Sequence, residues 1–460
     1  MYRKGRRRIH FVGIGGIGMS GIAEVLLNLR YTITGSDLKE TEITRRLSQL
    51  GCEITYGHRR ENVRGADVVV VSSAIKESNS EVQEAKALMI PVIPRAEMLA
   101  ELMPMKYGIA VAGTHGKTTT ASMIATVLAH GGLDPTMVIG GRVNSVGSSA
   151  KLGTGEFLVA EADESDGTFL KLSPTIAIIT NIDPEHLDYY GDMEHLKKTF
   201  LQFANKVPFY GSSILCFDHR NVRSLFPYIK KRYITYGLID GVNVRGKDIA
   251  PEGWYVTFQA YWNDRPLGTV ILRMPGIHNV YNALAAIACG LELEIEFSFI
   301  QEALEGFMGV QRRFQCKGEY AGITVVDDYA HHPEEIRSTL LAAEGLGKER
   351  IVVMFQPHRY TRTRDLFEEF LSIFKPAALL FVTDIYAAGE DPIPGVSSEI
   401  LVEEIRRHGH DAVYHVPDKD RLTDTVLGYL RPGDLVMTLG AGNIWEVSEA
   451  IVEALRDRRQ

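Results

Sequence analysis

The sequence predicts an α/β fold in three domains, and three observations support this prediction. The chain has 460 residues, which is enough for about three domains of roughly 150 residues each. Two glycine-rich turns, at residues 13–18 and 113–118, each follow an apolar run typical of a buried strand and precede a helical pattern. From residue 311 onward, strand and helix patterns alternate as in a doubly wound sheet. The expected domains are therefore residues 1–105, 106–310 and 311–460.

The composition is that of an ordinary globular protein, with 45% hydrophobic and 23% charged residues. The net charge of −8 argues against a nucleic-acid partner. No apolar run approaches the roughly 18 residues of a membrane span, so we expect no membrane association. The four cysteines lie far apart without a CxxC pair, which fits a reducing cytoplasm. The basic start at residues 3–8 is interpreted as a solvated end rather than a targeting signal.

The first expected domain begins with a dinucleotide-binding pattern. Residues 13–18 match G-x-G-x-x-G between a predicted strand and a helix expected over residues 19–29. Asp37 lies 19 residues beyond Gly18, close to the place where a Rossmann fold binds ribose. The alternative is a glycine-rich turn without a ligand. This pattern predicts a Rossmann-like domain with strands at residues 9–12, 31–34, 67–71 and 91–94.

The second glycine-rich turn carries a phosphate-loop pattern, which predicts a P-loop ATPase-like central domain with a mostly parallel sheet. It connects a strand expected at residues 107–112 to a helix expected at 121–129, and free N–H groups and the helix dipole favour anions there. Two residues separate its glycines instead of the usual four. The alternative is a strand–helix turn that merely contains glycine. The predicted phosphate-binding residues are Gly113, Thr114, His115, Gly116, Lys117, Thr118 and Thr119.

Polar residues follow two further predicted strands of the central domain. A strand from residue 157 ends in acids at 161–166, and a strand at 176–179 precedes a polar segment that contains His186. A carboxylate at such a strand end can hold the metal of a nucleotide, and the carboxyl ends of parallel strands converge on one crevice. Solvated loop residues are the alternative. Residues 211–273 are β-like and predict an antiparallel insert or sheet edge.

A helix expected at residues 283–289 is preceded by two asparagines with two possible roles. Asn279 and Asn282 could contact a base edge, or Asn279 could cap the helix.

The third expected domain is Rossmann-like. Polar turns at residues 327–333, 356–364 and 386–391 follow its strands, and their arginines suit phosphate or carboxylate. A solvated basic loop is the alternative. The expected strands are residues 323–326, 351–355, 378–383, 412–415 and 435–439, and the expected helices are residues 333–343, 365–374, 398–408, 421–430 and 444–455.

Three nucleotide-sized units in one chain are too many for a simple dehydrogenase or kinase. The combination resembles the Mur ligase family, the ATP-dependent amide-forming enzymes of peptidoglycan precursor synthesis. The shortened phosphate loop is that family's loop, and further motifs at residues 13–20, 161–166, 327–333 and 356–363 extend the resemblance over essentially the whole chain. Within the family, the chain looks like the alanine-adding branch.

The resemblance implies the reaction and its partners. ATP and Mg²⁺ would be the cofactors, and UDP-N-acetylmuramate and L-alanine the substrates, joined through an acyl phosphate. The product would serve cell-wall biogenesis, and with it cell shape and cell division. The oligomeric state, monomer or homodimer, stays open.

The resemblance also implies roles for individual residues. Lys117 would contact the terminal phosphates of ATP, Thr118 and Glu161 would hold one magnesium ion, and His186 would bind a second metal. The UDP-sugar would lie against Gly15, Gly16, Ile17, Gly18, Met19, Ser20, Asp37, Ser72 and Ser73. The adenine side of ATP would contact His278, Asn279 and Asn282. Arg313 would reach the phosphates from the third domain, and Asp328 and Tyr329 would contact the nucleoside.

The third domain would bind the amino acid and complete the ATP site. His331, Arg359 and Arg362 would frame the reacting carboxylate and act with Lys117 in catalysis, with His331 either as the base or as the group that orients the carboxylate. Several relatives use a carbamylated lysine at a position that here falls on Leu201. The alanine-adding branch lacks that lysine too, which leaves the other ligands of the second metal open.

Three alternative functions are weighed against this one. A recycling ligase would join a whole tripeptide to the same UDP-sugar. An NAD(P)-dependent oxidoreductase would use the first glycine turn but would leave Lys117 and Glu161 without a role. A nucleotide-gated binding module would have no ligase activity.

Overall fold

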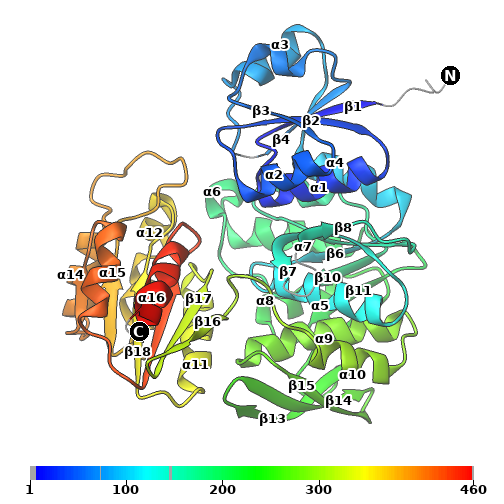
Figure 1. The fold of residues 1–460 in the computed structure, drawn as a ribbon. Coiled ribbons are helices and arrows are strands. Elements are labelled where there is room, and N and C mark those ends of the chain that lie inside the picture. The colour runs from blue at the N-terminus through cyan, green and yellow to red at the C-terminus, as the bar shows by residue number, and fades with distance from the viewer. Residues whose placement is uncertain (1–6, 73, 144–147, 458–460) are drawn as a thin grey trace, which may run out of the picture. The chain divides into compact units, whose positions relative to one another are not determined.

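The fold contains three sheets, which Figure 1 shows in a computed structural model of the chain. The structure describes residues 7–72, 74–143 and 148–457. The chain divides into two compact units. One contains residues 1–247, 259–270 and 281–307, and the other contains residues 248–258, 271–280 and 308–460. No helix among the described residues is long and apolar enough to cross a membrane.

The first sheet has five parallel strands in the order β3-β2-β1-β4-β5. Helices α1, α2 and α4 lie on one side of it and α3 on the other (Figure 1). The predicted strands are confirmed, while β3 was not predicted because its residues are mostly exposed and form no apolar run. The elements are β1 Arg8–Val12, α1 Ile17–Asn28, β2 Thr32–Asp37, α2 Glu42–Gln49, β3 Glu53–Tyr56, β4 Val68–Val71, α3 Ser80–Ala87, β5 Val92–Pro94 and α4 Arg95–Leu102.

The central sheet has ten strands in the order β15-β14-β13-β12-β11-β10-β6-β9-β7-β8. Strand β6 pairs in parallel with β9 on one side and β10 on the other, so the carboxyl ends of these strands meet at one edge. The β-like segment predicted at 211–273 contains β11 and the strands that extend the sheet to its β15 edge.

The predicted strands at 107–112 and 176–179 coincide with β6 and β10. The strands of this sheet are β6 Tyr107–Ala112, β7 Thr136–Val143, β8 Ser148–Lys151, β9 Phe157–Glu161, β10 Ile176–Ile179, β11 Ser212–Cys216, β12 Tyr233–Gly237, β13 Val244–Glu252, β14 Tyr255–Trp262 and β15 Arg265–Leu272. The helices that follow are α5 Lys117–His130, α6 Leu187–Tyr190, α7 Met193–Ala204, α8 Arg220–Arg223, α9 Ile277–Glu292 and α10 Phe297–Glu305.

The third sheet has six strands in the order β16-β17-β21-β18-β19-β20. Its strands are parallel except for β16, an antiparallel edge strand that was not predicted because it is half-exposed. The helix predicted at residues 365–374 is two helices, α12 and α13, which meet at Leu366.

The remaining predicted strands and helices of this unit are confirmed. The elements are β16 Gln315–Tyr320, β17 Ile323–Asp328, α11 Pro333–Glu344, β18 Arg350–Phe355, α12 Tyr360–Asp365, α13 Phe367–Ile373, β19 Leu379–Val382, α14 Ser398–Arg407, β20 Val413–His415, α15 Lys419–Leu427, β21 Asp434–Leu439 and α16 Trp445–Asp457.

A buried polar network fixes α3 against the first sheet. The Glu81 carboxylate accepts hydrogen bonds from Ser36 (2.6 Å) and Asn62 (2.5 Å), lies 2.9 Å from His58 Nδ1 and lies 3.5 Å from His10 Nε2. Burial opposes ionisation of Glu81, but the nearby His10 imidazole and the hydrogen bonds from Ser36 and Asn62 outweigh it, and the pKa of Glu81 lies below its usual value. The carbonyl of Ser36 also accepts the N–H groups of residues 13 and 14, so the network supports the first glycine turn.

Replacing Glu81 by alanine should destabilise this unit strongly, because the substitution leaves several buried polar groups without their acceptor. We expect Glu81→Ala to lower the free energy of unfolding by about 3–5 kcal/mol, measured by urea denaturation. Glu77→Ala, which removes an exposed carboxylate just before the same helix, is the control and should change it by less than about 1 kcal/mol. Similar urea midpoints for the two variants would contradict the structural role of the network.

Candidate active site

The turn after β6 is held in a conformation that glycine alone allows. Gly113 has φ +138° and Gly116 has φ +80°. A Cβ on Gly113 would lie 2.0 Å from Thr180 Oγ1, and one on Gly116 would lie 2.6 Å from Asn282 Oδ1. The two glycines therefore let the backbone approach its neighbours closely, immediately before α5 begins at Lys117.

The segment after β10 braces this turn. Asn181 Oδ1 accepts the N–H of His115 at 2.7 Å, and Asn181 Nδ2 donates to the carbonyl of His115 at 3.0 Å. Thr114 Oγ1 accepts the N–H of Asp183 at 2.8 Å, and the Asp183 carboxylate lies 3.6 Å from His115 Nε2. The loop is thus fixed by contacts within the protein, which preorganises it for an anion at the N-terminus of α5.

Lys117 is held at the centre of the loop. Its ammonium donates to the carbonyls of Gly113 (2.6 Å) and Thr114 (3.1 Å) and to Glu164 Oε1 (2.8 Å). Burial disfavours the charged form of Lys117, but the negative charges of Glu164 and Asp163 outweigh burial and raise its pKa. Lys117 therefore stays charged at neutral pH, as a phosphate ligand must.

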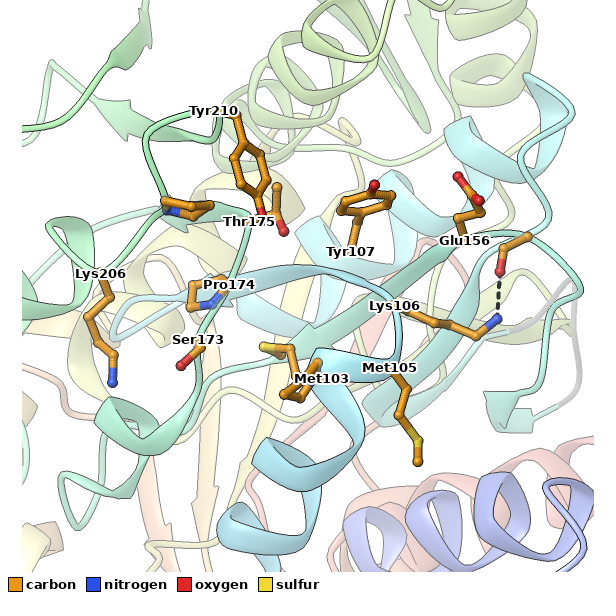
Figure 2. Close-up of a pocket in the computed structure, with 13 residues that line it drawn as sticks. Met103, Met105, Lys106, Tyr107, Glu156, Ser173, Pro174, Thr175, Lys206 and Tyr210 are labelled. Atoms are coloured by element: carbon orange, nitrogen blue, oxygen red, sulfur yellow. Dashed lines mark hydrogen bonds between the residues drawn. The ribbon is translucent and has the colours of Figure 1, made fainter.

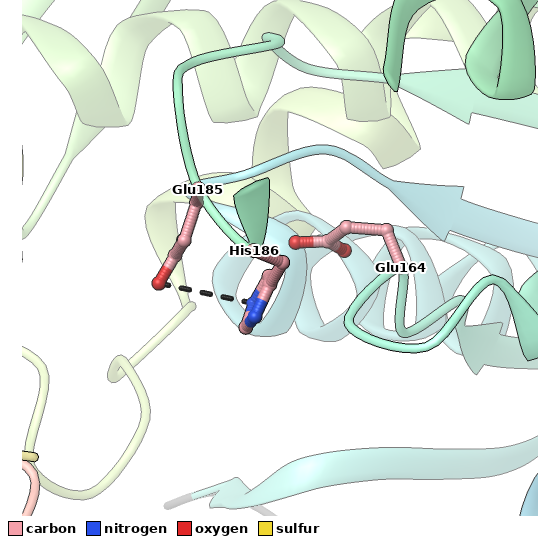
Figure 3. Close-up of side chains that lie close together, drawn as sticks. All are labelled: Glu164, Glu185 and His186. Atoms are coloured by element: carbon pink, nitrogen blue, oxygen red, sulfur yellow. Dashed lines mark ion pairs between the residues drawn. The ribbon is translucent and has the colours of Figure 1, made fainter. Parts of the chain in front are cut away.

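Three side chains beside the loop form a candidate cation site. Figure 3 shows Glu164, Glu185 and His186, whose ligand atoms lie within 4.8 Å of one another. Burial raises the pKa of Glu164 to about 7, and its Oε2 is buried without a hydrogen-bond partner among the described residues. His186 Nε2 lies 3.9 Å from Glu185 Oε1. A divalent cation fits this donor set, because it would satisfy the unpartnered oxygen and neutralise the carboxylates.

The cluster contains one of the three predicted metal ligands. His186 belongs to it, whereas the Glu161 carboxylate accepts the N–H of Gly140 at 2.6 Å and Thr118 is buried in the first turn of α5. The metal roles of Thr118 and Glu161 stay predictions. Sequence reasoning did not select Glu164 or Glu185, although both lie within the polar segments that it had singled out.

The two asparagines of α9 differ in their environment. Asn282 Oδ1 accepts a hydrogen bond from Thr120 Oγ1 at 3.0 Å, which places it against the first turn of α5. Asn279 is the third residue of α9, and its Nδ2 donates to the carbonyl of Pro275 at 2.8 Å. The interpretation of Asn279 as a helix cap is therefore wrong, because the helix begins before it. Contact of either residue with a base stays a prediction.

In the second unit, Asp328 and Tyr329 lie at the end of β17. Asp328 accepts the N–H groups of Phe314 and Ala330 at 2.7 Å each, and burial raises its pKa to about 6. The Tyr329 ring has the guanidinium carbons of Arg312 and Arg313 at 4.8 and 5.1 Å from its centroid. The predicted residues Arg313, Asp328 and Tyr329 thus form one cluster.

His278 is a further predicted ATP contact in this unit. Burial, with the positive charge of Arg313, lowers the pKa of His278 to about 4. Its imidazole is therefore neutral at pH 7.

His331 and the predicted arginine Arg362 lie next to the ring of His358 in this unit. His331 Nδ1 lies 3.3 Å from Glu335, and the ring of His331 lies 5.7 Å from that of His358. Arg362 donates to the carbonyl of His358 at 3.1 Å. Burial and the charges nearby lower the pKa of His358 to about 3. Arg359 has φ +71°, a strained conformation held by a hydrogen bond from its N–H to the carbonyl of residue 386 at 2.9 Å.

Glu335 connects the two groups of this unit and was not predicted. Its carboxylate lies 3.7 Å from Arg313 and accepts the N–H of His331 at 3.2 Å. It belongs to the first turn of α11, where it completes a capping box with His332. A glutamate three residues after a helix cap is a visible sequence signal, but the signal indicates capping and gives no hint of these partners.

Among the described residues, most of the predicted UDP-sugar contacts lie in or beside the first glycine turn. The N–H of Gly15 donates to Asp37 Oδ2 at 2.8 Å, so Asp37 lies against the turn. Gly16 caps α1, and Ile17, Gly18, Met19 and Ser20 form its first turn. Ser72 follows β4 and is half-buried. Ser73 lies outside the described residues.

A cavity of about 740 Å³ lies at the opposite end of the central strands (Figure 2). Tyr107, at the start of β6, and Thr175, just before β10, line it together with Met103 and Tyr210. Lys106 points to this end of the sheet, where it donates to the carbonyl of Gly153 at 2.9 Å. Since the phosphate loop follows the other end of β6, this cavity is separate from the candidate active site.

Comparison with known proteins identifies the class to which this α/β chain belongs. Mur ligase profiles match in three consecutive parts: the family's catalytic domain at residues 8–107, its middle domain at 111–290 and its glutamate ligase domain at 312–442. The chain belongs to the Mur ligase family. This membership removes the oxidoreductase and the binding module from the alternatives.

Particular relatives cover nearly the whole chain. The UDP-N-acetylmuramate–L-alanine ligases of Geotalea uraniireducens and Geobacter sulfurreducens are each 60% identical to it over 98% of both chains. The crystal structure of the UDP-N-acetylmuramate–alanine ligase of Thermotoga maritima matches with 30% identity and a TM-score of 0.84, over 98% of this chain and 99% of that one.

A methyl group on Gly113 should disrupt the phosphate loop, because its Cβ would collide with Thr180 Oγ1. We expect Gly113→Ala to weaken ATP binding at least about tenfold, measured by calorimetry. Gly132→Ala is the control, since Gly132 has φ +81° but no atom of the residues that the structure describes lies within 4 Å of its Cβ position. ATP affinity that falls equally in both variants would point to backbone strain in general and contradict a specific role for the close approach.

Proposed function

We propose that this protein is an ATP-dependent ligase that joins L-alanine to the lactyl carboxylate of UDP-N-acetylmuramate. The products are UDP-N-acetylmuramoyl-L-alanine, ADP and phosphate. The observation that carries the proposal is the preformed loop with Lys117 and the acids beside it, in a chain 60% identical to ligases of that name. The function fits a step of peptidoglycan precursor synthesis, and four free cysteines fit a cytoplasmic site.

The chemistry requires activation of the carboxylate, since a carboxylate does not react with an amine at neutral pH. The lactyl carboxylate attacks the γ-phosphate of ATP, which gives an acyl phosphate and ADP. The amine of alanine then attacks the acyl carbon and phosphate leaves. Positioning and charge neutralisation dominate phosphoryl transfer, and the ammonium of Lys117 with the N–H groups of the loop provides both.

The cation ligands proposed for this reaction come from the ends of the central strands. Glu164, Glu185 and His186 would hold a divalent cation, with Thr118 and Glu161 as the further predicted ligands for Mg²⁺. Such a cation, when bound, neutralises charge on the phosphates. Glu164 Oε2, which is buried and has no hydrogen-bond partner among residues 7–72, 74–143 and 148–457, supports this assignment.

Residues of the third sheet would serve the nucleoside and the acceptor. Asp328 and Tyr329, with Arg313, are proposed to contact ATP, and Arg359 and Arg362 are proposed to bind the carboxylate groups of the two substrates. His331 would orient the lactyl carboxylate or accept the proton of the amine. Its contact with Glu335 at 3.3 Å supports either role, because a carboxylate fixes the orientation of the imidazole.

The domain assignment extends this proposal. Residues 1–105 would bind the UDP-sugar, residues 106–310 would bind ATP, and residues 311–460 would bind the amino acid and complete the ATP site. Phosphate release with UDP-N-acetylmuramate and either alanine or a tripeptide tests the acceptor. We expect release with alanine, whereas release with the tripeptide alone would favour the recycling ligase.

Removal of the Lys117 ammonium should abolish the reaction without affecting the UDP-sugar. We expect Lys117→Ala to lower kcat at least about a thousandfold, in a coupled assay of phosphate release, with an unchanged Kd for UDP-N-acetylmuramate. Lys106→Ala, which removes a lysine that also donates to backbone carbonyls but lies at the opposite end of β6, is the control. A Lys117→Ala variant that retains ligation would remove the loop from the mechanism.

Replacement of Arg362 should weaken substrate binding more than turnover. We expect Arg362→Ala to raise the KM of one substrate about tenfold or more, because a guanidinium binds carboxylate with charge-assisted hydrogen bonds. Arg364→Ala is the control, since the Arg364 side chain is half-exposed and pairs with the neighbouring Asp365. Steady-state kinetics that give Arg362→Ala an unchanged KM and kcat would contradict a role of this residue in substrate binding.

A further inference from the structure

Arg95 joins the carboxyl edges of two sheets within one unit. It is the first residue of α4 and directly follows β5 of the first sheet. Its Nη2 lies 3.1 Å from Asp163 Oδ2, and Asp163 follows β9 of the central sheet. Ligands of open α/β sheets bind at the carboxyl ends of the strands. Arg95 thus connects the two edges at which the UDP-sugar and ATP are proposed to bind.

The Arg95 guanidinium also occupies the space beside the first glycine turn. A Cβ on Gly18 would lie 2.2 Å from Arg95 Nη1. Gly18 lies in the first turn of α1 and is not in the left-handed region, so packing rather than backbone conformation requires glycine there. The third glycine of the G-x-G-x-x-G pattern therefore makes room for an arginine side chain.

The charges around Arg95 indicate an anion. The first turn of α1, a helix of 12 residues, carries a partial positive charge, and a cation beside it is unfavourable unless anions compensate. Asp163 provides one negative charge and is itself half-exposed. The diphosphate of the sugar nucleotide, proposed to bind at this turn, would provide another, and a planar guanidinium can bind two oxyanion groups at once.

Asp163 continues the connection to the phosphate loop. It immediately precedes Glu164, whose carboxylate accepts the hydrogen bond from Lys117 at 2.8 Å. Asp163 itself pairs with Arg95, with 3.1 Å between Arg95 Nη2 and Asp163 Oδ2. The two adjacent acids are thus held by two cations, one at each nucleotide site.

We propose that Arg95 is a positioning residue that binds the diphosphate of the UDP-sugar and Asp163 at the same time, and thereby couples the sugar-nucleotide site to the ATP site. This proposal rests on the proposed function. Binding of the sugar nucleotide orders Arg95, which fixes Asp163 and with it the position of Glu164 beside Lys117. Because such coupling is reciprocal, an ATP analogue must strengthen the binding of the sugar nucleotide by the same factor.

The test measures the Kd of UDP-N-acetylmuramate by calorimetry, with and without a non-hydrolysable ATP analogue. For the wild type we expect the analogue to tighten binding at least about fivefold. Arg95→Met should weaken the sugar nucleotide about tenfold or more and remove this enhancement. Asp163→Asn should remove the enhancement while retaining most of the affinity. Arg95→Lys, which keeps the charge but loses the fork, should give intermediate values for both.

The matched control is Lys171→Met. Lys171 pairs with Glu97, which also lies in the first turn of α4, so this variant removes another ion pair of the same helix without affecting Gly18 or Asp163. It should retain the wild-type Kd and its enhancement. Equal losses in Lys171→Met and Arg95→Met would indicate a purely structural role and overturn the proposal.

Two further outcomes separate this inference from the proposed function. A wild-type protein that forms no product from UDP-N-acetylmuramate, alanine and ATP would contradict the proposed function. An active wild type with an unchanged Kd and enhancement in Arg95→Met would contradict only the role of Arg95.

Discussion

The close approach between the turn after β6 and the segment after β10 is the constraint on which the candidate active site depends. Gly113 leaves no room for a side chain beside Thr180, and Asn181 pairs with both backbone groups of His115. These contacts satisfy the backbone N–H and carbonyl groups of His115 within the protein. The N-terminus of α5 is therefore presented for an anion in a fixed geometry, which spares the ligand the entropic cost of ordering a loop.

A chain of opposite charges extends from this turn. Lys117 and Glu164 are both largely buried, and neither charge would be stable there without the other. One oxygen of Glu164 has no hydrogen-bond partner within the described part of the chain, so it could bind a cation. The neighbouring acid, Asp163, forms an ion pair with Arg95, which directly follows β5 of the first sheet. The buried charges thus gain their stability from partners on different strands.

In the second unit, too, the proposed functional groups follow the carboxyl ends of parallel strands. Strands β17 and β18 are separated only by β21, so the polar residues that follow them gather at one edge of the sheet. Glu335 lies between Arg313 and His331 and gives the cationic residues a shared counter-charge. This arrangement keeps several arginines close together, which suits substrates that bring phosphate and carboxylate groups.

The sequence by itself determined the α/β class, most of the buried strands and the two glycine turns, because apolar runs and glycines express local requirements; β6 and β10 coincide with their predicted bounds. It did not determine β7, whose apolar run is short and is followed by two glycines. It did not determine the exposed edge strands β3 and β16, which lack an apolar run. Only the tertiary structure decided that Glu164, Glu185, Glu335 and Arg95 lie at the proposed sites. Glu164 meets Lys117, Arg95 meets Asp163 and Glu335 meets Arg313 across long stretches of chain. Strand order and side-chain direction, which no local pattern specifies, bring these pairs together.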